Sequence, residues 1–295
     1  MSNRSLSIGC AKTSSCGFLK TTIICDYYPA GGLPGADPYK KFVVTPKPTT
    51  TPTQTPTQTP TQTPTKTPTQ TPTQPPTPTP TTPPVSPNDS DWRTKNILTP
   101  VKSQGNCGSC WSYASIAHIE AKYMQKYGGD PNTAIDLSEQ QMVNCLPYGC
   151  AGGWYTKIFR TFATGIQSEA DIPYVAKNDT CVHQPDRPHV KWASWKFLHN
   201  TKQAIIDELQ NGPVVTGVMS DTTWRNYKSG ILNCAVKYND TNHVIVIVGY
   251  NTYNDYWIVR NSWGTKWGYG GYAYINATND DCYMIGINNP AVVNF

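Results

Sequence analysis

Long apolar runs are missing from this chain of 295 residues. The longest ones, such as residues 244–248, are far below the ~18 to 20 residues that a membrane-spanning helix needs. Near the start, the apolar run 18–25 is interrupted by Lys20 and two threonines, so no secretory signal is visible. The sequence therefore predicts a protein without a membrane span.

Net charge is also missing from the larger part of the chain. Residues 88–295 contain 17 Lys/Arg and 17 Asp/Glu, and the net charge of +5 comes from residues 1–44 together with Lys47 and Lys66. Proteins that bind nucleic acid usually carry a basic face. We therefore expect no nucleic-acid partner for the part that folds.

Apolar residues are scarce between positions 45 and 87, where 15 of the 26 prolines lie among threonines and glutamines. Such a stretch cannot bury a core, and its TPTQ repeats favour an extended polyproline II linker that spans up to roughly 130 Å. It is either a flexible spacer or a specific ligand for proline-binding domains, and its threonines make it a mucin-like O-glycosylation substrate. The expected organisation is a Cys-containing N-terminal arm and candidate pro-segment (1–44), a low-complexity linker (45–87) and a globular domain (88–295).

Cysteine, in contrast, is abundant, with ten residues in the chain. This number suggests disulfides and an oxidising compartment, either lysosome-like or secreted, with a virion as the alternative. Reduced thiols in a cytosolic protein are the other interpretation. Five N-x-S/T sequons suggest a glycoprotein, and they begin at Asn3, Asn88, Asn178, Asn239 and Asn276.

Helical patterns come first in the globular part and strand patterns follow. Apolar or small residues spaced by three or four predict a helix from 111 to about 127, and further helices are expected at 137–144 and 202–210. Segments rich in Val, Ile, Tyr and Trp predict strands at 243–250, 256–260 and 271–276. This order indicates an α+β fold.

The segment QGNCGSCW stands directly before the first helix and ends in a candidate nucleophile. Cys110 would lie at the positive end of the helix dipole, which favours the thiolate. The side-chain amide of Gln104 could join the Cys110 backbone N–H in binding an oxyanion. Two alternatives use the same cysteines: a Cys107/Cys110 redox pair, or a zinc site with Cys145 and Cys150.

A cysteine nucleophile needs a proton donor and a group that orients it. His243 opens an apolar strand, and Asn261 follows the next strand, so the amide oxygen could fix the imidazole tautomer while Trp263 shields the bond from water. The other four histidines indicate no such role: His118, within the first helix, and His183, His189 and His199 in loop-like surroundings.

These motifs resemble the papain family of cysteine proteases over residues 89–295. Four blocks occur in the family's order: Gln104 to Trp111, Cys150-Ala151-Gly152-Gly153, His243 before Gly249-Tyr250, and Asn261-Ser262-Trp263-Gly264 before Trp267-Gly268. The resemblance implies a two-lobed α+β fold, with Cys110 on the central helix of a helical lobe and His243 and Asn261 on a β-rich lobe. It also implies a cysteine endopeptidase that acts through a Cys110/His243 thiolate–imidazolium pair and an acyl-enzyme.

The resemblance extends to the substrate. Gln104 would line the oxyanion hole, and Gly152 and Gly153 would pair with the substrate backbone. Trp154 and Gly217 would shape the pocket for the second residue before the scissile bond, and Asn242 would add no charge there. The expected partners are protein or peptide substrates of a monomeric enzyme with no cofactor or metal. The alternative is a catalytically silent papain-like binding or structural protein on a stalk.

The resemblance also implies three disulfides: Cys107–Cys150, Cys145–Cys181 and Cys234–Cys282. The arm then retains Cys10, Cys16 and Cys25, an odd number. One arm thiol would pair with Cys110 as a latch, stay free, or pair between molecules.

Overall fold

The computed structural model describes residues 86–295, except 163–164, 183, 235–240, 279–281, 283 and 286–288, together with two strands of the arm. Nearly all of the expected linker and most of the arm, with the latch, therefore lie outside the described residues. The arm strands, β1 (Ser7–Thr13) and β2 (Thr22–Tyr28), pair antiparallel in a unit separate from the rest of the chain.

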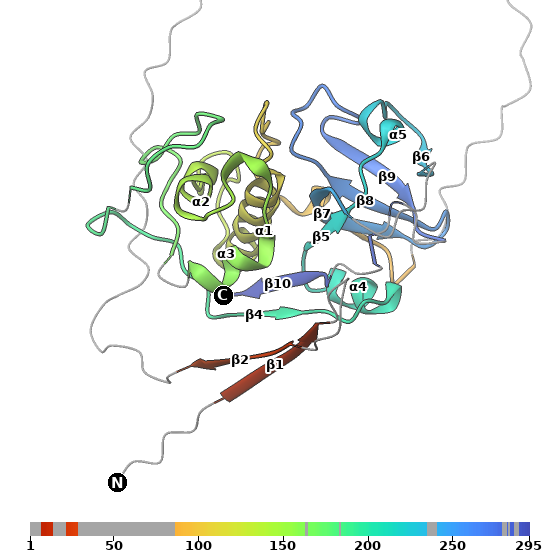
Figure 1. Ribbon diagram of the computed structural model, residues 1–295. Helices are drawn as coiled ribbons and strands as arrows, with labels where there is room; N and C mark the ends of the chain where they lie inside the picture. The colour runs from red at the N-terminus through yellow and green to blue at the C-terminus, as the bar shows by residue number, and fades with distance from the viewer. Residues whose placement is uncertain are drawn as a thin grey trace, which may run out of the picture. The chain divides into compact units, whose positions relative to one another are not determined.

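The globular part has a helical lobe and a β-rich lobe (Figure 1). The α-helices of the helical lobe are α1 (Cys110–Tyr127), α2 (Glu139–Cys145) and α3 (Tyr155–Thr161). Short 3-10 turns precede them or lie between them, at η1 (Trp92–Lys95) and η2 (Gly149–Ala151). Two further helices flank the sheet, α4 (Lys202–Leu209) and α5 (Thr222–Arg225).

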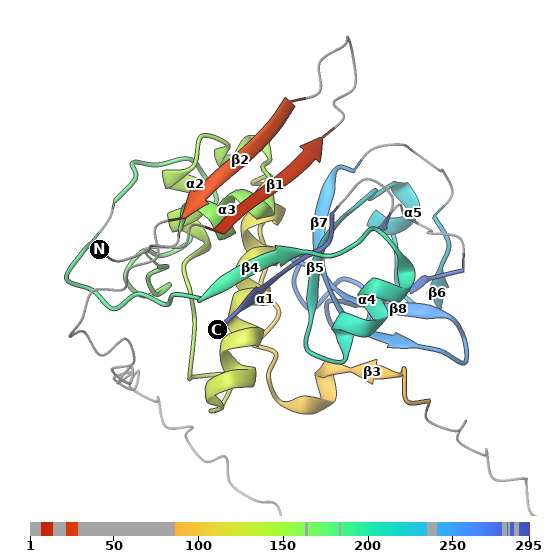
Figure 2. The ribbon, with the colours of Figure 1, turned by 90° about the horizontal axis from the view of Figure 1, so that it is seen from below.

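The sheet has the strand order β4-β10-β5-β7-β8-β9-β6, and β3 pairs with β7 beside this path. Its longest strand is β7 (His243–Asn251), which lies between β5 (Val214–Val218) and β8 (Tyr256–Arg260). The remaining strands are β3 (Ser90–Asp91), β4 (Ser194–Phe197), β6 (Ile231–Leu232), β9 (Tyr272–Asn276) and β10 (Ala291–Asn294). Figure 2 shows β4 and β10 side by side, as their pairing requires.

Both faces of β7 are covered, which explains its continuous apolar sequence. Val244, Val246 and Val248 belong to the core that packs on α1, whereas Ile245 and Ile247 belong to the core formed with α4. Helix α1 lies directly against β7, and Cys110, the first residue of the helix, belongs to the same core cluster as Val244, the second residue of the strand.

The expected α+β fold is confirmed. The predicted helices correspond to α1, α2 and α4, and the predicted strands to β7, β8 and β9, all within two residues at each end. Helices α3 and α5 and strands β3, β4, β5, β6 and β10 were not predicted. The strands other than β5 have only two to four residues, and Gly217 interrupts the apolar pattern of β5. Among the described residues, no helix is long and apolar enough to cross a membrane.

Candidate active site

Cys110 is the first residue of α1, and the loop before it is held close to the helical lobe. The Cys107–Cys150 disulfide and a hydrogen bond from Gly108 N to Cys150 O, 3.0 Å long, fix this loop. A side chain at Gly108 would lie 2.5 Å from the Cys150 carbonyl, so only glycine fits there. The thiol of Cys110 is free and 8% exposed.

His243 is the first residue of β7 and is 5% exposed. Its Nε2 lies 2.7 Å from Oδ1 of Asn261, which directly follows β8. The same oxygen accepts a hydrogen bond of 2.8 Å from the backbone N–H of Ser262. An oxygen that accepts from both groups requires the proton on Nε2, which leaves Nδ1 as the basic nitrogen.

Aromatic rings enclose this pair. The Trp263 ring centroid lies 4.9 Å from that of His243, and the Trp224 centroid lies 6.4 Å away. Asn261 is 3% exposed, so its bond to the imidazole is shielded from bulk water. Trp263 therefore lies where a ring that shields the bond between His243 and Asn261 is expected.

Burial disfavours charge on both candidate reacting groups. It raises the pKa of the Cys110 thiol, and backbone N–H groups, the first of them from Val244 beside His243, only partly oppose it. It lowers the pKa of His243 to about 4, against the hydrogen bond to Asn261. The helix dipole was expected to favour the Cys110 thiolate. The N–H groups of Cys110 and Trp111 at the start of α1 act in that direction and lower the pKa of the thiol, but burial raises it by more when the thiol is considered alone.

Gln104 is tied to both lobes. Its amide nitrogen donates to the Cys107 carbonyl over 2.8 Å, and its amide oxygen accepts from Ser262 Oγ over 2.6 Å. Its backbone N–H also donates to the Ser262 carbonyl. The sequence indicated Ser262 only as part of the motif Asn261-Ser262-Trp263-Gly264, because its partner Gln104 lies 158 residues away.

The residues expected to contact substrate lie in two groups. In the helical lobe, Gly152 has φ +105°, a side chain at Gly153 would lie 2.8 Å from the Trp111 ring, and Trp154 is 56% exposed. In the β-rich lobe, Gly217 is paired with Val244 in neighbouring strands.

Asn242 precedes His243 and is exposed. Its amide is engaged by Ser220, whose N–H and hydroxyl both donate to Oδ1 and whose carbonyl accepts from Nδ2. The side chain therefore holds the loop beside His243 and adds no charge.

The structure contains the three expected disulfides, Cys107–Cys150, Cys145–Cys181 and Cys234–Cys282. The first two engage the cysteines that the redox and zinc alternatives require, so both alternatives are excluded. The disulfides are consistent with an oxidising compartment.

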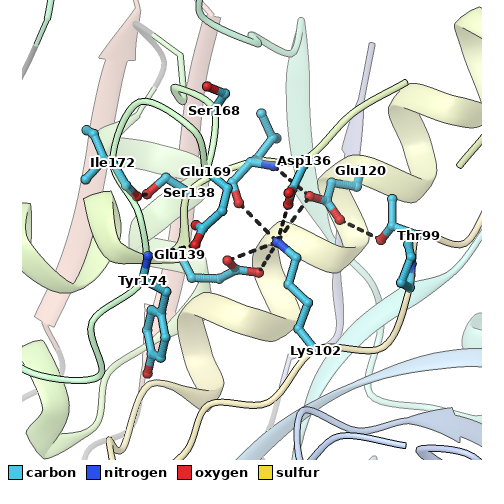
Figure 3. A network of polar contacts seen from close by, with 12 residues as sticks. Thr99, Lys102, Glu120, Asp136, Ser138, Glu139, Ser168, Glu169, Ile172 and Tyr174 are labelled. Atoms are coloured by element: carbon cyan, nitrogen blue, oxygen red, sulfur yellow. Dashed lines mark hydrogen bonds and ion pairs between the residues drawn. The ribbon is translucent and has the colours of Figure 1, made fainter. Parts of the chain in front are cut away.

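A charge network that the sequence analysis did not predict lies next to the site (Figure 3). Its carboxylates Glu120 and Glu139 are buried, whereas the Asp136 side chain is 62% exposed. The Lys102 ammonium lies 2.7 Å from Asp136, 2.9 and 3.1 Å from the two carboxylate oxygens of Glu139, and 3.8 Å from Glu120. Burial alone would lower the pKa of Lys102, but the carboxylates raise it. Burial raises the pKa of Glu139 to about 8, with Lys102 acting in the opposite direction.

The network continues toward β8. Thr99 donates to Glu120 over 2.6 Å, and Arg260 donates to Thr99 over 3.3 Å. The sequence contains one indication of this network, which is that two ionisable residues stand among apolar ones. Glu120 lies within α1, and Arg260 ends the apolar strand β8.

Comparison with protein families gives one match that covers the globular part. The model described as "Papain family cysteine protease" matches residues 86–294. Among curated proteins, gamete and mating-type specific protein A of Dictyostelium discoideum is 44% identical over 313 aligned residues, which cover 97% of this chain and 69% of that protein. A cysteine protease of Blomia tropicalis is 37% identical, with 69% of this chain and 64% of that protein covered. Ananain of Ananas comosus is 36% identical, with 63% and 54% covered, so the chain spans little more than half of ananain.

Solved structures agree with this result. Digestive procathepsin L2 from the larval midgut of Tenebrio molitor is 31% identical with a TM-score of 0.66, covering 72% of this chain and 69% of that one. The Carica candamarcensis cysteine protease CMS1MS2, solved in complex with E-64, is also 31% identical with a TM-score of 0.63, covering 71% of this chain and 99% of that one.

Proposed function

The chain belongs to the papain family of cysteine proteases, and from this premise we propose that it is an endopeptidase whose nucleophile is Cys110 and whose acid–base group is His243. The observation that carries the proposal is the free thiol at the start of α1, next to the strand whose first residue is a histidine bonded to Asn261. Papain-family membership supports peptidase activity in general, and the geometry supports these particular roles.

The reacting groups are proposed to ionise as a pair. Each is buried, and each alone prefers its neutral form. Transfer of the thiol proton to Nδ1 of His243 creates two opposite charges side by side, which stabilise each other strongly where water is excluded. The Asn261 oxygen accepts from Nε2 and so orients the imidazolium.

The reaction follows from these positions. The Cys110 sulfur attacks the substrate carbonyl carbon, and the carbonyl oxygen becomes an oxyanion. The Cys110 backbone N–H and the second N–H of the Gln104 amide donate to it, since the first is bonded to Cys107 O. The imidazolium then gives its Nδ1 proton to the leaving amine, and an acyl-enzyme remains. Water, deprotonated by the neutral imidazole, releases the acyl group and regenerates the thiol.

Substrate is proposed to lie along the boundary of the lobes. The backbone of Gly152 and Gly153 would pair with the substrate, because no side chain blocks it there. Trp154 and Gly217 would form the pocket for the second residue before the scissile bond, with no charge added by Asn242. The enzyme would act as a monomer in a lysosome-like or secreted compartment, with a virion as the alternative.

A catalytically silent papain-like protein is the second candidate, and labelling of the thiol separates the two. The full chain is incubated with E-64 under reducing conditions and then analysed by mass spectrometry and peptide hydrolysis. We expect one adduct, on Cys110, and loss of hydrolysis, with neither adduct nor hydrolysis in the Cys110→Ala variant. Undiminished hydrolysis by Cys110→Ala would refute the mechanism, and a parent chain that is folded but neither labelled nor active would favour the silent protein.

A further inference from the structure

Arg260 occupies an unusual place, because a guanidinium lies in a row of core residues. Side chains alternate along β8, and Ile258, two residues earlier, belongs to the core that packs on α1. Arg260 is 5% exposed, and Asn261 follows it. A buried arginine next to the residue that holds His243 therefore needs partners of its own.

Part of each side chain is satisfied within the protein. Arg260 Nη2 donates to the Pro100 carbonyl over 2.8 Å and to Thr99 Oγ1 over 3.3 Å. Asn261 Oδ1 accepts from His243 and Ser262. Within the part of the chain that the structure describes, Arg260 Nη1 and Asn261 Nδ2 are buried and have no hydrogen-bond partner.

Both residues line the same small cavity, between α1 and the sheet. Its volume is about 10 Å³, and its polar lining also includes Lys102, Glu139 and Tyr113. Arg260 Nη1 and Asn261 Nδ2 can only donate, so neither can satisfy the other. A cavity of this size admits about one water molecule, which offers two lone pairs and two protons.

We propose that Arg260 is a positioning residue for Asn261 and acts through one water bound in this cavity. The water accepts from Arg260 Nη1 and Asn261 Nδ2 and donates toward the Glu139 carboxylate. Glu139 is itself held by Lys102 in the network of Figure 3.

The consequence concerns the orientation of the amide. The Asn261 side chain can bind the imidazole correctly only with its oxygen toward His243, and rotation by 180° would present two N–H groups to Nε2–H. A partner that accepts from Nδ2 favours the correct orientation, and the fixed guanidinium holds that partner in place. Arg260 would thus affect the chemical step without contact with substrate.

A double-mutant cycle tests this inference, which rests on the proposed function. Arg260→Met keeps much of the length of the side chain and removes the donors. We expect kcat to fall about tenfold with KM unchanged, the loss that corresponds to one buried hydrogen bond. In the Asn261→Ala background, where no amide remains to be oriented, Arg260→Met should change kcat by less than about twofold.

The matched control is Thr99→Val, which removes a partner of Arg260 Nη2 and the hydrogen bond to Glu120 but leaves Nη1 and Asn261 unchanged. It should retain the parent kcat. If the kcat losses of Arg260→Met and Asn261→Ala multiply in the double variant, Arg260 has a merely structural role and the inference is overturned. A loss of kcat in Thr99→Val equal to that in Arg260→Met would overturn it as well.

A crystal structure of the parent chain provides a readout that does not depend on activity or on the folding of Arg260→Met. An ordered water within hydrogen-bonding distance of both Arg260 Nη1 and Asn261 Nδ2 is expected, and its absence would overturn the inference. A parent chain that neither hydrolyses peptide nor reacts with E-64 would refute the proposed function. The presence or absence of the water in the crystal structure would still decide the inference about Arg260.

Discussion

Gln104 and Ser262 are joined by two hydrogen bonds, although 158 residues separate them in the sequence. The Gln104 backbone N–H donates to the Ser262 carbonyl over 2.9 Å, and Ser262 Oγ donates to the Gln104 amide oxygen over 2.6 Å. Ser262 also donates its backbone N–H to Asn261 Oδ1. One serine therefore orients both the amide proposed to bind the oxyanion and the amide that holds the histidine.

Ser262→Ala should lower kcat about tenfold and leave KM nearly unchanged. The substitution removes the hydrogen bond that fixes the Gln104 amide, which is proposed to act on the oxyanion and not on the bound substrate. Steady-state kinetics on one peptide substrate measures the effect. Ser115→Ala is the matched control, since that buried hydroxyl bonds to the Trp111 carbonyl of its own helix. Equal losses in the two variants would contradict the assigned role.

Trp154→Ala should weaken the binding of substrates with an aromatic second residue before the scissile bond. In the variant we expect KM to rise several-fold for a substrate with Phe at that position, because an apolar contact is lost. In the parent we expect kcat/KM to be higher for Phe than for Arg, because the charge of Arg would be buried without a partner. Kinetics on peptides that differ only at this residue measures both effects. Tyr253→Ala, a substitution of another exposed aromatic residue in the β7–β8 turn, should change neither. A strong preference for Arg in the parent would reject the pocket assignment.

The stability of the fold should decrease in acid because of His118. This side chain is fully buried and accepts a hydrogen bond from Val293 N, and burial lowers its pKa to about 3, with Lys122 acting in the same direction. The unfolded chain binds a proton near pH 6.5 and the folded chain does not, so the free energy of unfolding falls as the pH drops below about 6.5.

The matched variant for this prediction is His118→Gln, which keeps an acceptor and cannot titrate. Both chains carry Cys110→Ala, which prevents self-digestion, and their unfolding in urea is compared at pH 7 and about pH 4.5. The chain that retains His118 should lose about 2 kcal/mol more stability over this interval than the His118→Gln variant. Parallel pH profiles for the two chains would show that His118 does not contribute.

Removal of the Cys145–Cys181 disulfide should destabilise the domain. The two cysteines are separated by 36 residues and connect the end of α2 to a loop. In the chain-entropy model such a loop contributes about 4 kcal/mol, because the disulfide restricts the unfolded chain. The Cys145→Ser/Cys181→Ser variant, compared with its parent by urea unfolding in the Cys110→Ala background, should show most of this loss. A difference below about 1 kcal/mol would contradict it.

Local sequence patterns were sufficient for the elements that carry the reacting groups. The apolar spacing along α1 and the continuous apolar run of β7 both reflect burial, and in each case the residues of that one element are enough to predict it. Cys110 and His243 were therefore placed correctly at the start of a helix and of a strand. Strands β4, β5 and β10 were missed, because they depend on pairing with distant partners more than on their own pattern.

Contacts between distant segments were decided only by the tertiary structure. A glutamate in a helix and an arginine at a strand end usually lie at the surface, yet packing of α1 on the sheet buries Glu120 and Arg260 in one polar network. The effect of burial on the pKa of Cys110 likewise depends on the tertiary structure. The helix dipole is a local property that favours the thiolate, whereas desolvation depends on everything packed around the sulfur, and here desolvation is the larger effect.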